Sequence, residues 1–235
     1  MLGGTPVQNG ALQLIQFPGT FVMLRKAEPT GGTVVYDGKD ITHRKPRALR
    51  PLRREIQLVF QDPYSSLNPR RTVGAIVAEP LRLQRIGTRS ERRSRVREML
   101  EVVGLNPEHY NRYPHEFSGG QRQRIGIARA LITTPKLVVA DEPVSALDVS
   151  IRAQILDLFA ELNRRLGIAF LFITHDLTVA RALTDDVMVM ADGKIVERGP
   201  TAAVFAEPSS AAARALVGAA PDLHRAIARR LGEQG

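Results

Sequence analysis

Cysteine is missing from all 235 residues, so neither a disulfide framework nor a thiolate metal site can contribute to this protein. No apolar run approaches the roughly 18 residues that a membrane-spanning helix requires. Residues 11–24 are moderately apolar, but glutamines interrupt them and no Lys or Arg precedes them, so a signal peptide is not expected. Internal repeats are absent, and only the Ala/Ser-rich stretch 209–220 is typical of a tail or linker.

Lysine is also scarce, although the chain is basic. It carries 33 Lys and Arg against 24 Asp and Glu, a net charge of +9, and only five of the cations are lysines. Such an excess can serve the binding of nucleic acid or of an anionic membrane surface. The arginines are dispersed apart from a cluster at Arg89–Arg97, which favours an ordinary solvated surface. We therefore expect no nucleic-acid partner.

Alternating strand and helix patterns predict the fold. Between residues 136 and 190, short apolar runs typical of buried strands alternate with segments of helical spacing. The predicted strands are 137–140 and 168–173, and the predicted helices are 121–131, 151–166 and 177–183. For the helix 151–166, Asp148 or Ser150 is the expected cap and Gly167 the expected stop. This alternation predicts an α/β fold with a parallel sheet covered by helices.

Turn and cap signals predict the flanking elements. A hairpin is expected where Asp37-Gly38 follows the strand 33–36, and a second antiparallel pair is expected around Asp192-Gly193. Residues 56–60 alternate as a strand that ends at Gln61. Helices are predicted over 72–83 and from the Thr88 capping box to about Val103, and Gly104 is expected to end the second of them.

Two neighbouring stretches carry the candidate chemistry. The Ser118–Gly120 turn precedes a helix, and a helix that begins in this way directs its free N–H groups and positive dipole end at an anion, most often a phosphate. The strand 137–140 ends in the adjacent carboxylates Asp141 and Glu142. If the strand continued through them, their side chains would point to opposite faces. One could then hold a metal ion while the other orients a water molecule.

The order of four short motifs resembles one protein family. FSGGQ at 117–121 is followed by LVVADEP at 137–143, SALD at 145–148 and ITHD at 173–176. In this order and spacing, the motifs are similar to those of the ATPase subunits of ABC transporters. The stretch QDPYSSLNPR at 61–70 is similar to the branch that imports dipeptides, oligopeptides and nickel.

The resemblance implies a fold and a domain plan. The fold is a P-loop-NTPase-like α/β core with a mostly parallel sheet, a helical subdomain at about 72–116 and an incomplete N-terminal region. An unmatched segment, 1–24, is expected before the ABC ATPase domain, 25–208, and a C-terminal tail, 209–235, after it.

The resemblance also implies ligands and residue roles. ATP and Mg²⁺ would be the ligands, with Asp141 and Gln61 at the Mg²⁺. Glu142 would act as general base, His175 would contact the γ-phosphate, and Gln61 would reach the attacking water. The contacts to ATP held by a facing subunit, and across the dimer, would come from Ser118, Gly119, Gly120, Gln121 and Asp148.

The implied partners follow from the same family. They are integral-membrane permease subunits, a second ABC ATPase subunit in a homo- or heterodimer and, indirectly, a solute-binding protein. The implied location is the cytoplasmic face of the cell membrane, as a peripheral subunit.

One expected motif is missing from the sequence. A P-loop reads G-x-x-x-x-G-K-[ST], and none of the five lysines lies in that pattern. By the family's spacing the loop is expected near residues 10–17, where Ile15, Gln16 and Phe17 occupy the last positions. Hydrogen bonds to a charged group are worth roughly 1.5–3 kcal/mol each, so losing several would weaken ATP binding greatly.

The missing P-loop leaves alternatives open. The chain could be an importer ATPase with a damaged site of its own, or a non-catalytic partner that offers Ser118–Gly120 to a competent subunit. It could also be a truncated or frame-shifted product. An ABC ATPase that acts on nucleic acid or the ribosome would need long coiled-coil insertions or two ATPase units, and the sequence has neither.

Overall fold

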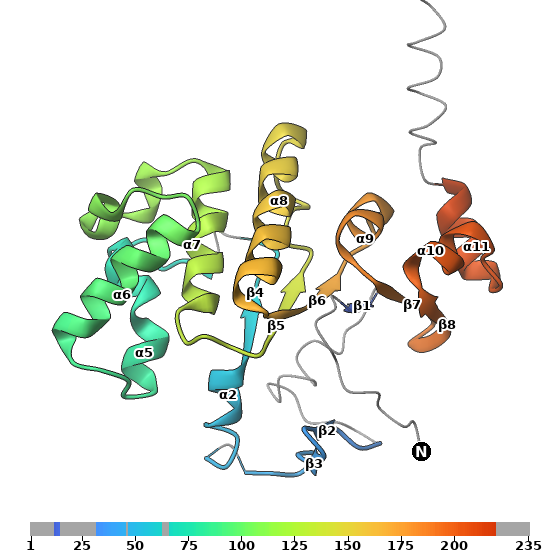
Figure 1. Ribbon diagram of the computed structural model, residues 1–235, viewed down its shortest axis with the longest axis horizontal. Helices are drawn as coiled ribbons and strands as arrows, with labels where there is room; N and C mark the ends of the chain where they lie inside the picture. The colour runs from blue at the N-terminus through green and yellow to red at the C-terminus, as the bar shows by residue number, and fades with distance from the viewer. Residues whose placement is uncertain (1–11, 15–31, 46, 63–65, 220–235) are drawn as a thin grey trace, which may run out of the picture.

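The structure is a computed structural model, and it describes residues 12–14, 32–45, 47–62 and 66–219 (Figure 1). A six-stranded sheet has the order β4-β5-β6-β1-β7-β8. Its strands are β4 (Ile56–Val59), β5 (Leu137–Asp141), β6 (Ala169–Ile173), β1 (Leu12–Leu14), β7 (Asp186–Ala191) and β8 (Lys194–Pro200). All neighbouring pairs are parallel except β7 and β8, which confirms the predicted mostly parallel α/β sheet.

Strand β1 was not predicted, because the sequence analysis assigned no element to residues 1–24. It pairs in parallel with β6 on one side and with β7 on the other, and so completes the middle of the sheet. The place expected for the P-loop, residues 10–17, lies outside the described residues except for this strand.

Both faces of the sheet are buried at the strands β5 and β6, which explains why these two strands appear as nearly continuous apolar runs. Successive side chains of a strand point to opposite faces. In β5, Val138 and Ala140 therefore join one cluster, with Phe170 and Phe172 of β6. Val139 joins a second cluster on the other face, with Leu171 and others.

Two long helices pack against the first of these clusters. They are α7 (Gly119–Leu131) and α8 (Val149–Leu166), and both lie beside the sheet in Figure 1. Helix α8 begins two residues before the predicted start, with Asp148 at its N-cap position, and ends at Gly167, whose φ of 62° is left-handed as predicted. The Asp148 side chain makes no capping hydrogen bond, so that part of the prediction is wrong.

The same buried cluster continues into a group of helices on one side of the sheet. These are α4 (Val73–Val77), α5 (Glu79–Leu83), α6 (Arg89–Val102) and the 3₁₀ turns η1 (Pro107–Asn111) and η2 (Pro114–Glu116). The capping box at Thr88 is confirmed, with both reciprocal hydrogen bonds present. The prediction of a single helix over 72–83 is wrong, because the helix is interrupted at Ala78. Pro80 follows this break and has no N–H to continue the ladder.

Of the remaining elements, the β2–β3 hairpin lies at the lower edge of Figure 1, α10 and α11 lie at the right, and α9 lies between α8 and α10. The hairpin of β2 (Val35–Tyr36) and β3 (Lys39–Asp40) turns at Asp37-Gly38 as predicted, although β2 is shorter than the predicted strand. Helix α2 (Leu52–Glu55) leads into β4, and α9 (Leu177–Leu183) follows β6. After β8 come α10 (Thr201–Ala206) and α11 (Ala211–Ala219).

Helix α11 differs from the tail or linker that its composition indicated. It buries Ala213 in a cluster with Val187 and Val189 of β7. None of the helices in the described part of the chain is long and apolar enough to cross a membrane.

Candidate functional site

The carboxyl ends of β5 and β6 bring together two of the predicted site residues. Asp141 is in register with Ile173, and the Glu142 amide donates to the Ile173 carbonyl oxygen at 2.8 Å. The strands therefore end side by side. The His175 Nδ1 atom lies 2.7 Å from Oε1 of Glu142, so the histidine and the carboxylate form a hydrogen-bonded pair.

Glu142 differs from Asp141 in its backbone. Strand β5 ends at Asp141, and Glu142 has a φ of 44°, in the left-handed region that few residues with a Cβ adopt. The strand does not continue through Glu142, so the condition under which the two side chains would alternate is not met. The Glu142 carbonyl oxygen accepts hydrogen bonds from the Ser145 amide at 3.2 Å and its Oγ at 3.1 Å, which hold this turn.

The loop that carries His175 is anchored from both sides. The Asp176 amide donates to Oγ1 of Thr174 at 2.9 Å, and Oδ1 of Asp176 accepts the Thr178 amide to cap α9. Arg152 of α8 donates from Nη1 to Oδ2 of Asp176 at 2.9 Å. The exposed His175 ring therefore projects from a fixed turn. Arg152 is not predictable from local sequence, because its partner Asp176 lies 24 residues later in the chain.

The first turn of α7 holds the predicted anion-binding segment. Ser118 is its exposed N-cap, and Ser118 and Gln121 form a capping box: Oγ of Ser118 accepts from the Gln121 amide, and Oε1 of Gln121 accepts from the Ser118 amide at 3.0 Å. A Cβ on Gly120 would lie 2.4 Å from Cγ2 of Ile151, so this glycine is needed for the close approach of α7 to α8. Gly119 precedes it at the helix start.

Gln123 links this helix to the loop after Glu142. Its side chain is 1% exposed, and its Nε2 donates to the Pro143 carbonyl oxygen at 2.7 Å. Because an unpaired buried carbonyl is costly, the contact fixes the loop relative to α7. The helical spacing of Gln123 with the apolar Ile127 and Ala130 would have predicted that this glutamine is buried.

Gln61 and Asp148 are placed at the same edge of the sheet, but no contact joins them to the pair within the described residues. Gln61 is exposed and follows β4, which lies next to β5 in the sheet. Asp148 is exposed at the start of α8. Their predicted roles thus stay predictions.

The carboxylates at this edge fit one mode of magnesium binding. Among the described residues, no group of three or more His, Cys, Asp and Glu side chains could hold a metal ion by itself. Mg²⁺ is commonly bound through one or two carboxylates together with the phosphates of a substrate. Asp141, at the end of β5, supplies one such carboxylate, so it fits an ion that arrives with a phosphate-bearing substrate.

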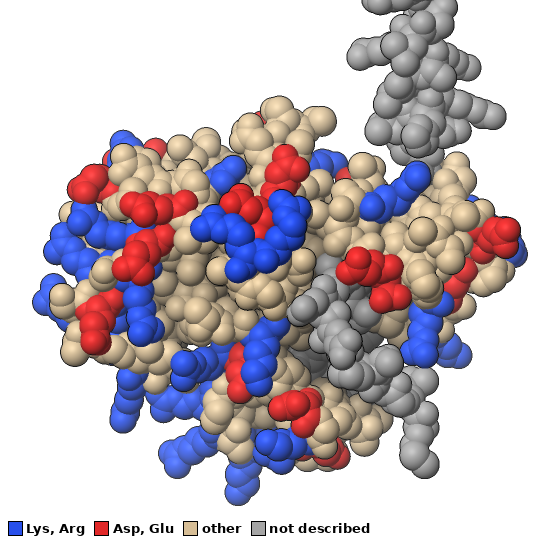
Figure 2. Space-filling view, viewed as in Figure 1, with Lys and Arg blue, Asp and Glu red and all other residues tan. Residues whose placement is uncertain are grey.

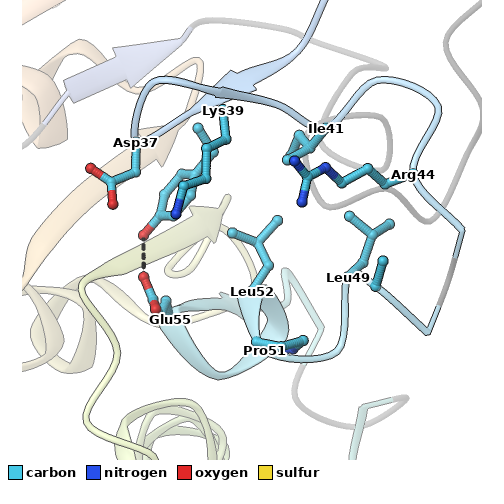
Figure 3. Close-up of a pocket in the computed structure, with 10 residues that line it drawn as sticks. Asp37, Lys39, Ile41, Arg44, Leu49, Pro51, Leu52 and Glu55 are labelled. Carbon is cyan, nitrogen blue, oxygen red and sulfur yellow. Dashed lines mark hydrogen bonds between the residues drawn. The ribbon is translucent and has the colours of Figure 1, made fainter.

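A separate cavity of about 200 Å³ lies at the opposite edge of the sheet, under the β2–β3 hairpin and beside α2 (Figure 3). Tyr36 Oη donates to Oε2 of Glu55 at 3.1 Å, and Lys136 Nζ lies 2.9 Å from the same oxygen. Burial, followed by the contact with Glu55, raises the pKa of Tyr36 to about 12. Tyr36, Glu55 and Lys136 are thus paired with one another at the cavity.

This chain is an α/β protein with a paired carboxylate and histidine at the carboxyl ends of its parallel strands, and with a helix that begins at a Ser-Gly-Gly turn. The chain belongs to the ABC transporter family, whose model matches residues 21–145.

Known relatives support this assignment. The chain is 52% identical over 199 residues to the glutathione import ATP-binding protein GsiA of Salmonella paratyphi A, a match that covers 85% of this chain and 32% of that protein. It is 49% identical over 197 residues to the di/tripeptide transport ATP-binding protein DppF of Pseudomonas aeruginosa, covering 84% of this chain and 61% of that protein. The chain thus spans about one third to three fifths of the length of these relatives.

A solved structure shares the fold. It is the dimeric, post-hydrolysis state of the ATP-binding cassette MJ0796 bound to ADP and Pi. The TM-score is 0.71 at 30% identity, and the match covers 83% of this chain and 86% of that chain.

Proposed function

We propose that this chain is an ATPase subunit of an ABC importer for dipeptides or oligopeptides. The observation that carries the proposal is the 2.7 Å contact between His175 and Glu142 at the end of β5, in a chain of the ABC transporter family. The import of peptides is supported by the names of the relatives, which describe di/tripeptide and glutathione transport.

Glu142 is the proposed general base. Its side chain is 21% exposed, so water reaches it while most of the carboxylate is enclosed. A carboxylate held in one orientation can accept a proton from an attacking water, and a general base of this kind contributes about 10²–10⁴-fold to a rate. The strained turn at Glu142 and the contact with His175 supply that orientation.

His175 is the proposed proton donor beside it. If the neutral ring carries its one hydrogen on Nδ1, that hydrogen is donated to Glu142 and Nε2 is left as an acceptor. A second proton turns Nε2 into a donor toward an anionic oxygen. The ring, with its side chain 61% exposed, can therefore hold a proton at Nε2 where a phosphate would lie.

The other site residues have proposed roles in binding. Asp141 and Gln61 would hold the magnesium ion, which neutralises charge on the phosphoryl group that is transferred. Ser118, Gly119, Gly120 and Gln121 would present the N-terminus of α7 to ATP on a facing subunit, since helix N-termini favour anions. Asp148 would contact that subunit.

The proposed assembly is a pair of ABC ATPase subunits on permease subunits in the membrane, at its cytoplasmic face, with a solute-binding protein as an indirect partner. The sequence contains no P-loop pattern. For that reason hydrolysis should be measured with a second, P-loop-bearing ABC subunit present, as well as with the chain alone.

The test compares Glu142→Gln with the parent chain in steady-state hydrolysis of Mg-ATP. We expect the substitution to lower the rate by about 100-fold or more, because the amide cannot accept the proton of water. Asp157→Asn is the matched control, since Asp157 is an exposed carboxylate of α8 away from the site, and its rate should be unchanged.

An unchanged rate in Glu142→Gln would contradict the proposed role of Glu142. If Glu142→Gln left the rate of the mixture unchanged while substitutions at Ser118 abolished it, the chain would be a non-catalytic partner that serves the second subunit. No hydrolysis under either condition would contradict the proposed function as a whole.

A further inference from the structure

A segment of unusual charge lies between β3 and β4. Residues 44–54 contain six cationic side chains and no carboxylate. The expectation that cations are dispersed outside Arg89–Arg97 is therefore wrong for these residues. We call these residues the basic segment. Its cations are Arg44, Lys45, Arg47, Arg50, Arg53 and Arg54.

All six cationic residues are exposed, and none makes an ion pair within the described residues. Their backbone is nevertheless held in place. Leu49 is 2% exposed, Arg50 donates to the Leu83 carbonyl oxygen, and the Arg54 carbonyl oxygen accepts from Oγ1 of Thr133 at 3.2 Å. Among the described residues, these contacts hold the backbone in place while the six cations have no ion-pair partner, although Nε of Arg44 donates to the Asp40 carbonyl oxygen at 3.0 Å.

The arginine cluster on α6 provides a contrast within the same chain. Its five arginines lie among three glutamates, Glu91, Glu98 and Glu101. Arg97 pairs with Glu108, and Arg93 lies 5.4 Å from the centre of the Tyr110 ring. The positive charge of that cluster is thus largely offset by nearby carboxylates, as is ordinary for a solvated helix. The positive charge of the basic segment is not offset in this way.

The surroundings of the basic segment favour one kind of anion. Figure 2 shows Lys and Arg side chains projecting along the lower edge of the molecule, where Figure 1 places α2 and the β2–β3 hairpin. Leu83, whose carbonyl oxygen accepts from Arg50, is 58% exposed and offers an apolar side chain beside the basic segment. The basic segment has no aromatic residue on which bases could stack, a feature that single-stranded nucleic-acid sites usually have.

We propose that the basic segment binds the surface of a membrane that contains anionic phospholipids. Clustered Lys and Arg are attracted to such surfaces within about a Debye length. The segment precedes β4, at the sheet edge opposite Glu142, so this contact leaves the candidate site open. The inference does not rest on hydrolysis and holds for a chain with or without ATPase activity.

The test is co-sedimentation of the purified chain with vesicles of phosphatidylglycerol and phosphatidylcholine, and with vesicles of phosphatidylcholine alone. We expect binding to the anionic vesicles only, weakening as salt rises. The fourfold variant Lys45→Gln, Arg47→Gln, Arg53→Gln, Arg54→Gln should bind roughly 600-fold more weakly, since each cation near an anionic surface contributes roughly a fivefold factor. These four side chains make no hydrogen bond or ion pair within the described residues, so the fold should be unaffected.

The control removes the same charge from α6, by Arg89→Gln, Arg93→Gln, Arg95→Gln and Arg97→Gln. Retained binding in this control, together with its loss in the first variant, supports the proposal. Equal losses in both would mean that only net charge matters and would overturn it. Absent vesicle binding would also overturn it, as would binding of a single-stranded oligonucleotide that anionic vesicles cannot displace.

Discussion

Glu142 shows at the scale of one residue how the site is held. Its φ of 44° costs a residue with a Cβ of order 1 kcal/mol, and the surrounding hydrogen bonds to Ile173 and Ser145 maintain it. A glycine would adopt the same conformation without strain. The turn thus keeps a glutamate where the backbone alone favours glycine, and the result is a carboxylate beside His175.

We therefore expect Glu142→Gly to keep or raise the stability of the fold, by up to about 1 kcal/mol, while it abolishes hydrolysis. Urea denaturation of the purified chain measures this. Glu142→Gln is the control, because it removes the charge but keeps the strained backbone, and it should show no such gain. A glycine variant clearly less stable than the glutamine variant would show that Glu142 is not strained.

At the scale of elements, helix α11 is fastened to β8 by one carboxylate. Glu197 accepts the Ser209 amide at 2.9 Å and the Ser210 amide at 2.8 Å. The hydrogen bond from the Ser209 amide is the main cause that lowers the pKa of Glu197, from an ordinary value of 4.5 to about 2. The ionised carboxylate therefore stabilises the docking of α11.

The sign of the pH dependence follows from the lowered pKa. The contribution is complete above about pH 4.5 and is lost as the pH falls toward about 2. We expect amide exchange in α11 to become faster across this window, relative to α8, when followed by hydrogen–deuterium exchange. In the Glu197→Gln variant, the amides of α11 should already exchange quickly at pH 5. An α11 whose protection matches that of α8 from pH 5 to pH 2 would contradict the assignment.

Element boundaries show what local sequence can predict. The capping box at Thr88 and the stop at Gly167 were predicted correctly, because caps depend on residues within one turn. The break at Ala78 was missed although Pro80 signalled it, since the apolar spacing continued across both helices. Helix α11 was missed because its Ala-rich composition resembles a linker until packing against β7 is known.

At the scale of the whole molecule, the parallel sheet was predictable from residues 136–190, where each strand is a buried apolar run. Strand β1 was not, because three residues acquire strand structure only through partners more than 150 positions later. The motifs identified Asp141, Glu142 and His175, and the structure brings the last two into contact. Arg152 and Gln123 depend on tertiary contacts and could not be found from spacing alone.

In the proposed function, this chain works as half of an ABC ATPase pair, and the N-terminus of α7 faces the nucleotide of the other half. Mg-ATP hydrolysis by the chain mixed with a P-loop-bearing ABC subunit tests this arrangement. Ser118→Arg is compared there with Thr88→Arg, since each substitution removes the N-cap of a capping box and costs about 1 kcal/mol of helix stability. We expect Ser118→Arg to lower hydrolysis on the order of 100-fold, as for loss of a group that stabilises transition-state charge, and Thr88→Arg to leave it unchanged. Equal rates in the two variants would mean that the N-terminus of α7 does not act on the nucleotide of the other half.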